Sequence, residues 1–228
     1  MPVSHSHRFI FVHVPRTAGT SLTMALEADG AKMEFDQPAF FELQSWQRTP
    51  EIVQMLRRTI PNDALGNLPL KHIPADALRA MLPAEVWNGY FKFSFSRNPW
   101  DRLVSIYHWI RRNSEHSDFF KAHFPDLVTM IQKVDSFAAF VHEYVMIMPG
   151  IAAHIMDSAG TILVDYVGRF EDLEQSVQTI AEKTGLRLEL PHTNRMDRRQ
   201  YRDYYTSETE EIVAKRFARD IELFGYAF

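Results

Sequence analysis

Apolar runs of strand-like composition alternate along this chain with segments of helical periodicity. Residues 8–14 and 90–96 are rich in aromatic and β-branched side chains, which predicts two buried strands. Shorter strands are expected at 68–73 and within 161–170. Apolar residues at helical spacing predict helices over 20–29, 50–59, 74–82, 99–112, 136–148, 171–184 and 206–224. This alternation favours an α/β fold with a central, mainly parallel sheet flanked by helices.

Composition narrows the class of protein. The chain has 228 residues, of which 46% are hydrophobic, enough for one globular domain over 1–228 with a sizeable core. Residues 1–7 are polar, and we expect them to form a short flexible tail. The net charge of −4 does not favour general binding to nucleic acid, and the absence of cysteine excludes disulfides and thiolate-bound zinc. No signal-like segment or stretch long enough to span a membrane is evident, so we expect a soluble, cytoplasmic protein.

The turn between the first strand and the first helix has the composition of an anion site. The strand is followed by Pro15 and then by Arg16, Thr17, Ala18, Gly19, Thr20 and Ser21. A tight turn into a helix offers backbone N–H groups and the positive end of the helix dipole to a phosphate or sulfate. The side chain of Arg16 adds a charge, and the hydroxyl groups of the turn add hydrogen-bond donors.

This turn differs from the Walker A motif of nucleotide hydrolases. Its basic residue, Arg16, comes before Gly19, and no lysine follows that glycine. No convincing acidic residue stands at the end of a hydrophobic strand to hold magnesium, since the strand 90–96 is followed by Arg97. An anion cradle without a magnesium site argues against ordinary nucleotide hydrolysis.

Four segments, spread over nearly the whole chain, carry a resemblance to a known family: FVHVPRTAGTSL, FKFSFSRNPWDRLVSIYHW, VGRFEDL and RDYYTSETEEIVAKRFARDIELFGYAF. In these segments the sequence resembles the sulfotransferases, in particular the branch that acts on carbohydrates. The resemblance implies a P-loop-like fold and the donor 3′-phosphoadenosine-5′-phosphosulfate. It also implies transfer of a sulfuryl group to a hydroxyl or amine, on this branch usually of a sugar, without a metal ion.

The resemblance also assigns roles in donor binding. Residues 16–21 correspond to the loop that binds the 5′-phosphosulfate, where Arg16 would neutralise the charge that develops on the leaving phosphate. Arg97 and Ser105 resemble the family's pair for the 3′-phosphate, and an arginine at a strand end can fork onto a phosphate. The structural alternatives are an ion pair of Arg97 and a solvated Ser105. Arg102 is interpreted as a surface or structural residue.

Sulfuryl transfer also needs a base near neutral pKa, because the acceptor hydroxyl must lose its proton. His72 lies at the end of the short strand expected within 68–73. It resembles the general base that many relatives place after their second strand. A structural hydrogen bond is the alternative for this histidine. Glu34 or Asp36 is an alternative base, as in relatives that use a carboxylate. His13, inside the first strand, is interpreted as a core residue.

Other basic residues could either contact the substrates or be solvated. Lys71 could contact the sulfuryl oxygens or face solvent, and the segment 192–205 resembles one that closes over the nucleotide in relatives. Its arginines could then contact the 3′-phosphate or an anionic acceptor, or could be solvated: Arg195, Arg198, Arg199 and Arg202.

Two rival functions stay compatible with the sequence. One is a P-loop kinase-like phosphotransferase, which would turn over ATP with magnesium. The other is a catalytically silent module that binds a nucleotide or a glycan. The first is distinguished by its need for a metal ion, and the second by the absence of turnover.

Overall fold

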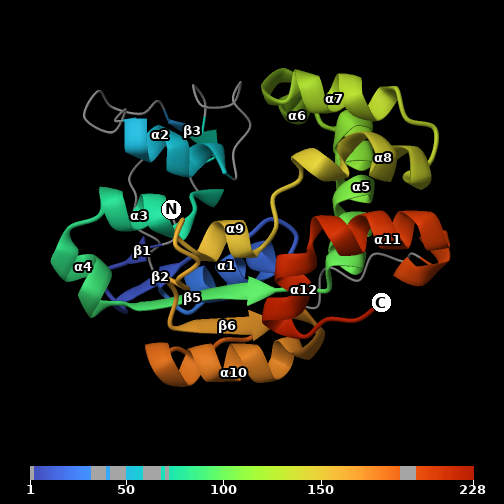
Figure 1. The fold of residues 1–228 in the computed structure, drawn as a ribbon. Coiled ribbons are helices and arrows are strands. Elements are labelled where there is room, and N and C mark those ends of the chain that lie inside the picture. Colours follow the sequence, from blue (N-terminus) through green and yellow to red (C-terminus); the bar gives the residue numbers. More distant parts are fainter. Residues whose placement is uncertain (1–2, 32–39, 42–49, 59–67, 70–71, 191–198) are drawn as a thin grey trace. The chain divides into compact units, whose positions relative to one another are not determined.

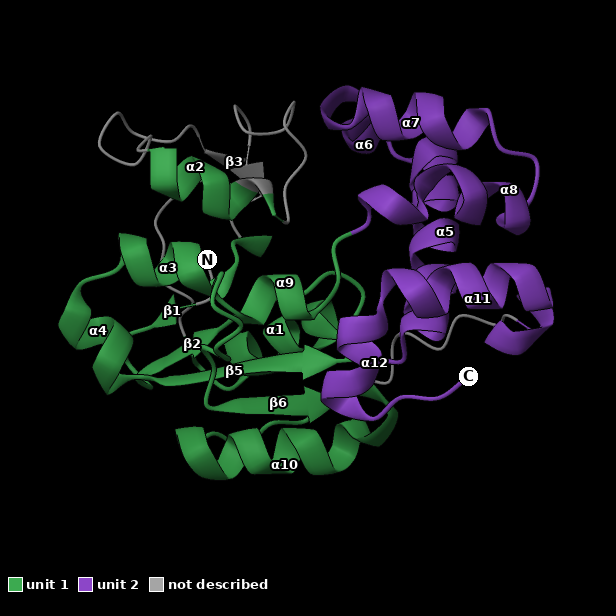
Figure 2. Ribbon diagram, viewed as in Figure 1, with its two compact units in different colours: residues 1–96, 149–195 green, residues 97–148, 196–228 purple. Residues whose placement is uncertain are grey.

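The computed structural model of the chain describes residues 3–31, 40–41, 50–58, 68–69, 72–190 and 199–228 (Figure 1). The chain forms two compact units (Figure 2). Unit 1 comprises residues 1–96 and 149–195, and unit 2 comprises residues 97–148 and 196–228. A single domain over 1–228 stays a prediction.

Unit 1 is built on a four-stranded sheet of order β1–β2–β5–β6. The strands are β1 (Val3–Ser4), β2 (Phe9–Phe11), β5 (Phe91–Ser96) and β6 (Tyr166–Arg169). β2, β5 and β6 run parallel to one another, whereas β1 is antiparallel to β2. The predicted α/β class with a mainly parallel sheet flanked by helices is therefore confirmed.

The N-terminal segment differs from the flexible tail expected over 1–7. Val3 pairs with Ile10 and Ser4 with Phe9 in the antiparallel ladder, and the side chains of Val3 and Ser4 are fully buried. The polar composition of the segment hid this edge strand, because the two residues that pair are too few to produce a periodic pattern.

The helices of unit 1 are α1 (Gly19–Ala28), α2 (Pro50–Arg57), α3 (Ala75–Met81), α4 (Ala84–Gly89), α9 (Ala152–Ile155) and α10 (Leu173–Thr184). A separate two-stranded antiparallel sheet pairs β3 (Phe40–Phe41) with β4 (Leu68–Pro69). Of the strand predicted over 68–73, Leu68–Pro69 pair outside the main sheet, whereas His72 and Ile73 are not in a strand.

Phenylalanines at alternate positions of the sheet form the core of unit 1. Phe9 and Phe11 of β2 are buried together with Phe93 and Phe95 of β5, because alternate side chains of a strand share one face. In the parallel register Phe9 lies beside residue 91 and Phe11 beside residue 93. Leucines of α1 and apolar residues of α10 also belong to the cluster: Leu22, Leu26, Val177 and Ile180. This core fixes the strand ends from which the candidate site is built.

Unit 2 is helical. It contains α5 (Pro99–His116), α6 (Asp118–His123), α7 (Pro125–Gln132), α8 (Phe137–Tyr144), α11 (Ser207–Arg216) and α12 (Ala218–Phe224), with short 3-10 turns at Val145–Ile147 and Tyr201–Tyr204. α5 begins as predicted, because Asn98 accepts hydrogen bonds from the N–H groups of Trp100 and Asp101 and Pro99 takes the first helical position. It continues beyond residue 112, to His116.

The single helix predicted over 206–224 is instead two helices. α11 is capped by Thr206 through a capping box with Thr209, and it ends at Arg216. Phe217, which is buried, separates α11 from α12. Neither glycine nor proline marks this break, so the apolar spacing alone could not locate it.

One stretch, Phe137–Ile155, is long and apolar enough to cross a membrane by length and composition. No stretch long enough to span a membrane was predicted from the sequence. In the structure this stretch is divided into α8, the turn Val145–Ile147 and α9, with Pro149 between them. Helices from the core of soluble proteins pass the same test, so the stretch is weak evidence for a membrane span.

Candidate functional site

The loop between β2 and α1 has an unusual backbone. Arg16 and Ala18 have φ angles of 67° and 72°, in the left-handed region that residues other than glycine rarely adopt. Each such residue costs about 1 kcal/mol or more, and persists only where the surroundings impose it. Left-handed residues in a turn are typical of backbone nests, in which N–H groups gather around an anion.

The N-terminus of α1 has no side-chain cap. Ala18 occupies the N-cap position, makes no side-chain hydrogen bond there, and no acidic residue stands in the first turn of α1. The first N–H groups of a helix have no partner within the helix itself, and the helix dipole gives that end a partial positive charge. An anion would complement both features.

The hydroxyl groups predicted to face an anion differ in their surroundings. Thr17 is fully buried, and its Oγ1 donates a hydrogen bond of 3.0 Å to the carbonyl of Val14. Its only hydroxyl hydrogen therefore secures the turn, and Thr17 can offer an anion its backbone N–H but not this hydrogen. Thr20 is exposed and Ser21 is 8% exposed. Their roles toward an anion stay predictions.

His72 lies next to the end of β2. Its Nδ1 is 3.0 Å from the carbonyl oxygen of His13. Since a carbonyl only accepts, Nδ1 must carry the hydrogen, and the Nε2 of the neutral ring is then an acceptor. This is the tautomer that a general base needs. A structural hydrogen bond was the alternative role for His72, and this bond is present. The same histidine can make this bond through Nδ1 and act as a base through Nε2.

His13 was interpreted as a core residue, and it is indeed 5% exposed. Its ring stacks on Phe11 with centroids 5.2 Å apart and lies 4.7 Å from the ring of His72. It also packs against Gly19, where an added Cβ would lie 1.9 Å from His13 Nε2. The contact with Gly19 was not predicted from the sequence. The available signal was that His13 follows a parallel strand at its carboxyl end, where ligands of α/β proteins bind.

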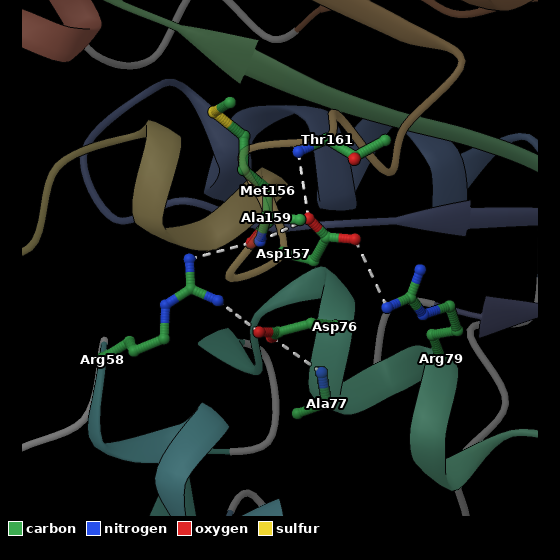
Figure 3. Close-up of polar contacts among 8 residues, drawn as sticks. All are labelled: Arg58, Asp76, Ala77, Arg79, Met156, Asp157, Ala159 and Thr161. Atoms are coloured by element: carbon green, nitrogen blue, oxygen red, sulfur yellow. Dashed lines mark hydrogen bonds and ion pairs between the residues drawn. The ribbon is translucent and has the colours of Figure 1, made fainter.

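A partly buried ion pair between Arg58 and Asp76 lies close in sequence to His72, and Figure 3 shows the pair with its neighbours. Asp76, in the first turn of α3, is 2% exposed, forms an ion pair with Arg58 and accepts a hydrogen bond of 2.8 Å from Ala77 N. Arg58 also donates to the carbonyl of Met156 at 2.9 Å. Burial raises the pKa of Asp76 above its usual value even though Arg58 lowers it. Beside this pair, Asp157 accepts hydrogen bonds from the backbone N–H groups of Ala159 and Thr161. Its other carboxylate oxygen lies 3.5 Å from Nη2 of Arg79.

Arg97 and Ser105 belong to unit 2. Arg97 is 6% exposed, and its Nε and Nη2 lie 2.8 and 2.7 Å from one oxygen of Asp101. An ion pair was the structural alternative to phosphate binding by Arg97, and this ion pair is present. It also holds the guanidinium of Arg97 in one orientation. Ser105, four residues beyond Asp101 on α5, is 2% exposed rather than solvated. A role of this pair toward a phosphate stays a prediction.

Arg102 is structural rather than a surface residue. It is 2% exposed, and burial lowers the pKa of its guanidinium to about 10 against the opposing effect of Asp220, which is equally buried. Arg202, from the predicted basic segment, stacks on Tyr201 and Phe228, with its guanidinium 5.1 and 5.7 Å from the ring centroids.

Several other predicted residues lie outside the described residues: Glu34, Asp36, Lys71, Arg195 and Arg198. Arg199 is described and exposed. Within the described ranges, no group of three or more histidine, aspartate or glutamate side chains gathers where it could hold a metal ion. The structure therefore brings the loop, His13 and His72 together within unit 1, and it places Arg97 beside Asp101 within unit 2.

Comparison with known proteins adds a family to this geometry. The family described as "Sulfotransferase family" matches residues 1–227. An uncharacterized protein of Archaeoglobus fulgidus is 26% identical over 124 residues, which cover 52% of this chain and 87% of that protein. The family match includes the loop after β2, His72, and the segment of Arg97 and Ser105.

Proposed function

The chain belongs to the sulfotransferase family, and from this premise we propose that it transfers a sulfuryl group from 3′-phosphoadenosine-5′-phosphosulfate to a hydroxyl of a carbohydrate or glycoconjugate. Family membership supports an enzyme that transfers sulfate. The donor, the sugar acceptor, the P-loop-like character of the fold, independence of metal ions and a cytoplasmic location are parts of the proposal.

The observation that carries the proposal is the loop after β2. It combines two residues in the left-handed conformation, Arg16 and Ala18, with a helix N-terminus that has no side-chain cap. These features suit the doubly anionic phosphosulfate, because N–H groups and a guanidinium can share its charge. For the 3′-phosphate we propose Arg97 and Ser105, with Asp101 orienting the guanidinium.

In the proposed reaction the donor supplies the sulfuryl group. The acceptor oxygen bonds to sulfur as the bond between sulfur and the phosphate oxygen breaks. His72 Nε2 takes the proton of the acceptor hydroxyl, while Nδ1–H stays on the carbonyl of His13. Arg16 and the first N–H groups of α1 stabilise the negative charge that grows on the leaving phosphate. The base and the anion loop thus act at opposite ends of one transfer.

Binding and transfer test the proposal separately. Calorimetry with adenosine 3′,5′-bisphosphate measures donor-site affinity, and labelled donor with a panel of sugar hydroxyl acceptors measures transfer in the presence of EDTA. We expect binding, and transfer that persists in EDTA. Magnesium-dependent phosphate transfer from ATP, with no sulfate transfer, would instead favour the kinase-like function. Bisphosphate binding without transfer to any acceptor would favour the silent binding module.

Variants assign the residues. His72→Ala should leave bisphosphate affinity nearly unchanged and lower turnover by about a hundredfold or more. Arg97→Ala should weaken bisphosphate binding by about 2 kcal/mol, as expected for a lost charge-assisted contact. His116→Ala and Arg112→Ala are matched controls, because both side chains are exposed on α5. Normal turnover in His72→Ala would redirect the search for the base to Glu34 or Asp36.

A further inference from the structure

We infer that His13 is a positioning residue of the proposed site, because it contacts both the general base and the anion loop. The inference rests on the proposed function and deepens it. His13 lies two residues before Pro15; its backbone carbonyl contacts His72, and its imidazole contacts both His72 and Gly19. The carbonyl holds His72, and the ring supports Gly19 at the start of α1.

The first contact sets the orientation of the base. His72 donates Nδ1–H to the carbonyl of His13 at 3.0 Å, and the two rings are 4.7 Å apart with an interplanar angle of 60°. This bond selects the tautomer with an acceptor at Nε2. A hydrogen bond on the far nitrogen is a common way to orient a functional imidazole. Movement of residue 13 would therefore turn His72.

The second contact sets the position of the helix start. Any Cβ at Gly19 would lie 1.9 Å from His13 Nε2 and 2.0 Å from its Cδ2, so the imidazole edge occupies the space that a side chain would need. Gly19 is the first residue of α1, and its neighbours supply the N–H groups proposed for the phosphosulfate. The glycine is thus required for the close approach of this ring.

The sheet core holds the ring of His13 in place. The ring stacks on Phe11 with an interplanar angle of 14°, and Phe11 stacks on Phe93 at 5.1 Å. Both phenylalanines are fully or almost fully buried. Because close-packed aromatic cores transmit displacement rather than absorb it, His13 fixes the anion loop and the base relative to the same strands.

A double-mutant cycle tests the contact between His13 and Gly19. Gly19→Ala should weaken bisphosphate binding about tenfold or more, because its Cβ needs the space of the imidazole. His13→Ala should weaken it less. The double variant should bind at least about fivefold more tightly than the product of the two single effects predicts, because the truncated side chain at 13 makes room for the new methyl group.

Two further readouts separate positioning from mere stability. The pH profile of kcat should shift in His13→Ala, since His72 loses its fixed surroundings, whereas general destabilisation moves only the thermal unfolding temperature. His13→Phe should lose less bisphosphate affinity than His13→Ala, because an aromatic ring still fills the gap. If His13→Ala does not fold, His13→Phe takes its place in the pH measurement. His116→Ala serves as the histidine control.

The outcomes are distinguishable. Additive effects of the two single variants, or an unchanged pH profile, in an enzyme whose wild type binds bisphosphate and transfers sulfate would overturn the role of His13 alone. A wild type that neither binds bisphosphate nor transfers sulfate would overturn the proposed function and this role together. Coupling in bisphosphate binding with a shifted pH profile supports the role of His13.

Discussion

Loss of the Arg58 guanidinium should loosen the segment that carries the proposed base. Arg58→Met removes the charge but keeps a long, apolar side chain. It leaves the carboxylate of Asp76, 2% exposed, without its cationic partner, and it removes the hydrogen bond to the carbonyl of Met156. Asp76 lies four residues after His72. The variant should therefore lower both the free energy of unfolding and the turnover of the folded enzyme.

The structure sets the size of the effect. Removing one partner of a buried ion pair costs about 3–5 kcal/mol, because the other charge is left buried. The side chain of Arg58 is 29% exposed, so water can partly solvate the site. The low end of that range, about 3 kcal/mol at neutral pH including the bond to Met156, is the expected loss in the free energy of unfolding.

The pH dependence follows from the raised pKa of Asp76. A carboxyl group whose folded-state pKa is raised binds its proton more tightly in the native state. The free energy of unfolding therefore falls as the pH rises through the window between the unfolded and folded pKa values. Without Arg58 the pKa of Asp76 should rise further, and a protonated carboxyl needs no cation. The difference between Arg58→Met and wild type should therefore shrink as the pH falls.

Urea unfolding at about pH 7.5 and about pH 5 measures this difference. The matched control is Arg79→Met, whose side chain is 43% exposed and lies 3.5 Å from Asp157. It should cost no more than about 0.5 kcal/mol, as surface ion pairs do. The reasoning is refuted if the two variants are equally stable, or if the loss in Arg58→Met is the same at both pH values.

Three other substitutions test the framework around the site. Thr206→Ala removes the capping box of α11 and should lower the free energy of unfolding by about 1 kcal/mol in urea; no change would mean that the cap is dispensable. Gly168→Ala should cost about 1–3 kcal/mol, because the new Cβ would lie 2.8 Å from Phe95 Cε1, and a full wild-type melting temperature would contradict this packing. Asn98→Ala removes the cap of α5 and the 2.8 Å hydrogen bond to the carbonyl of Ala227, so the free energy of unfolding should fall. Bisphosphate affinity should also fall, because Asn98 adjoins Arg97 in the sequence.

Local signals explain which parts of the fold could be predicted. The strand at Phe91–Ser96 was recognisable from its aromatic, apolar run, and α5 from the Asn98–Pro99 start. The end of α10 was marked by Gly185, whose φ of 73° suits a glycine C-cap. Each of these features is determined by residues that are adjacent in sequence.

Features that depend on distant contacts could not be predicted in the same way. Val3 and Ser4 become a strand only because β2 offers an edge, and the charge that opposes the effect of burial on the pKa of Arg102 comes from Asp220, far along the chain. The break at Phe217 has no glycine or proline to mark it. In the site, the loop was evident from residues 15–21, whereas the contact of His13 with Gly19 arises from packing across the turn.

The loop also shows why a motif underdetermines the roles of its residues. From sequence, residues 17–21 were all expected to donate backbone or hydroxyl hydrogen bonds to an anion, beside the charge of Arg16. In the structure Thr17 turns its hydroxyl inward to the carbonyl of Val14, Ala18 ends the turn in a left-handed conformation without a side-chain cap, and Gly19 makes space for His13. Within the proposed function, the charge of the leaving phosphate would therefore be shared by backbone N–H groups, Arg16 and the hydroxyls of Thr20 and Ser21, without the Thr17 hydroxyl. Catalysis would then depend on how rigidly the strand end holds those groups, which is the property that His13 supplies.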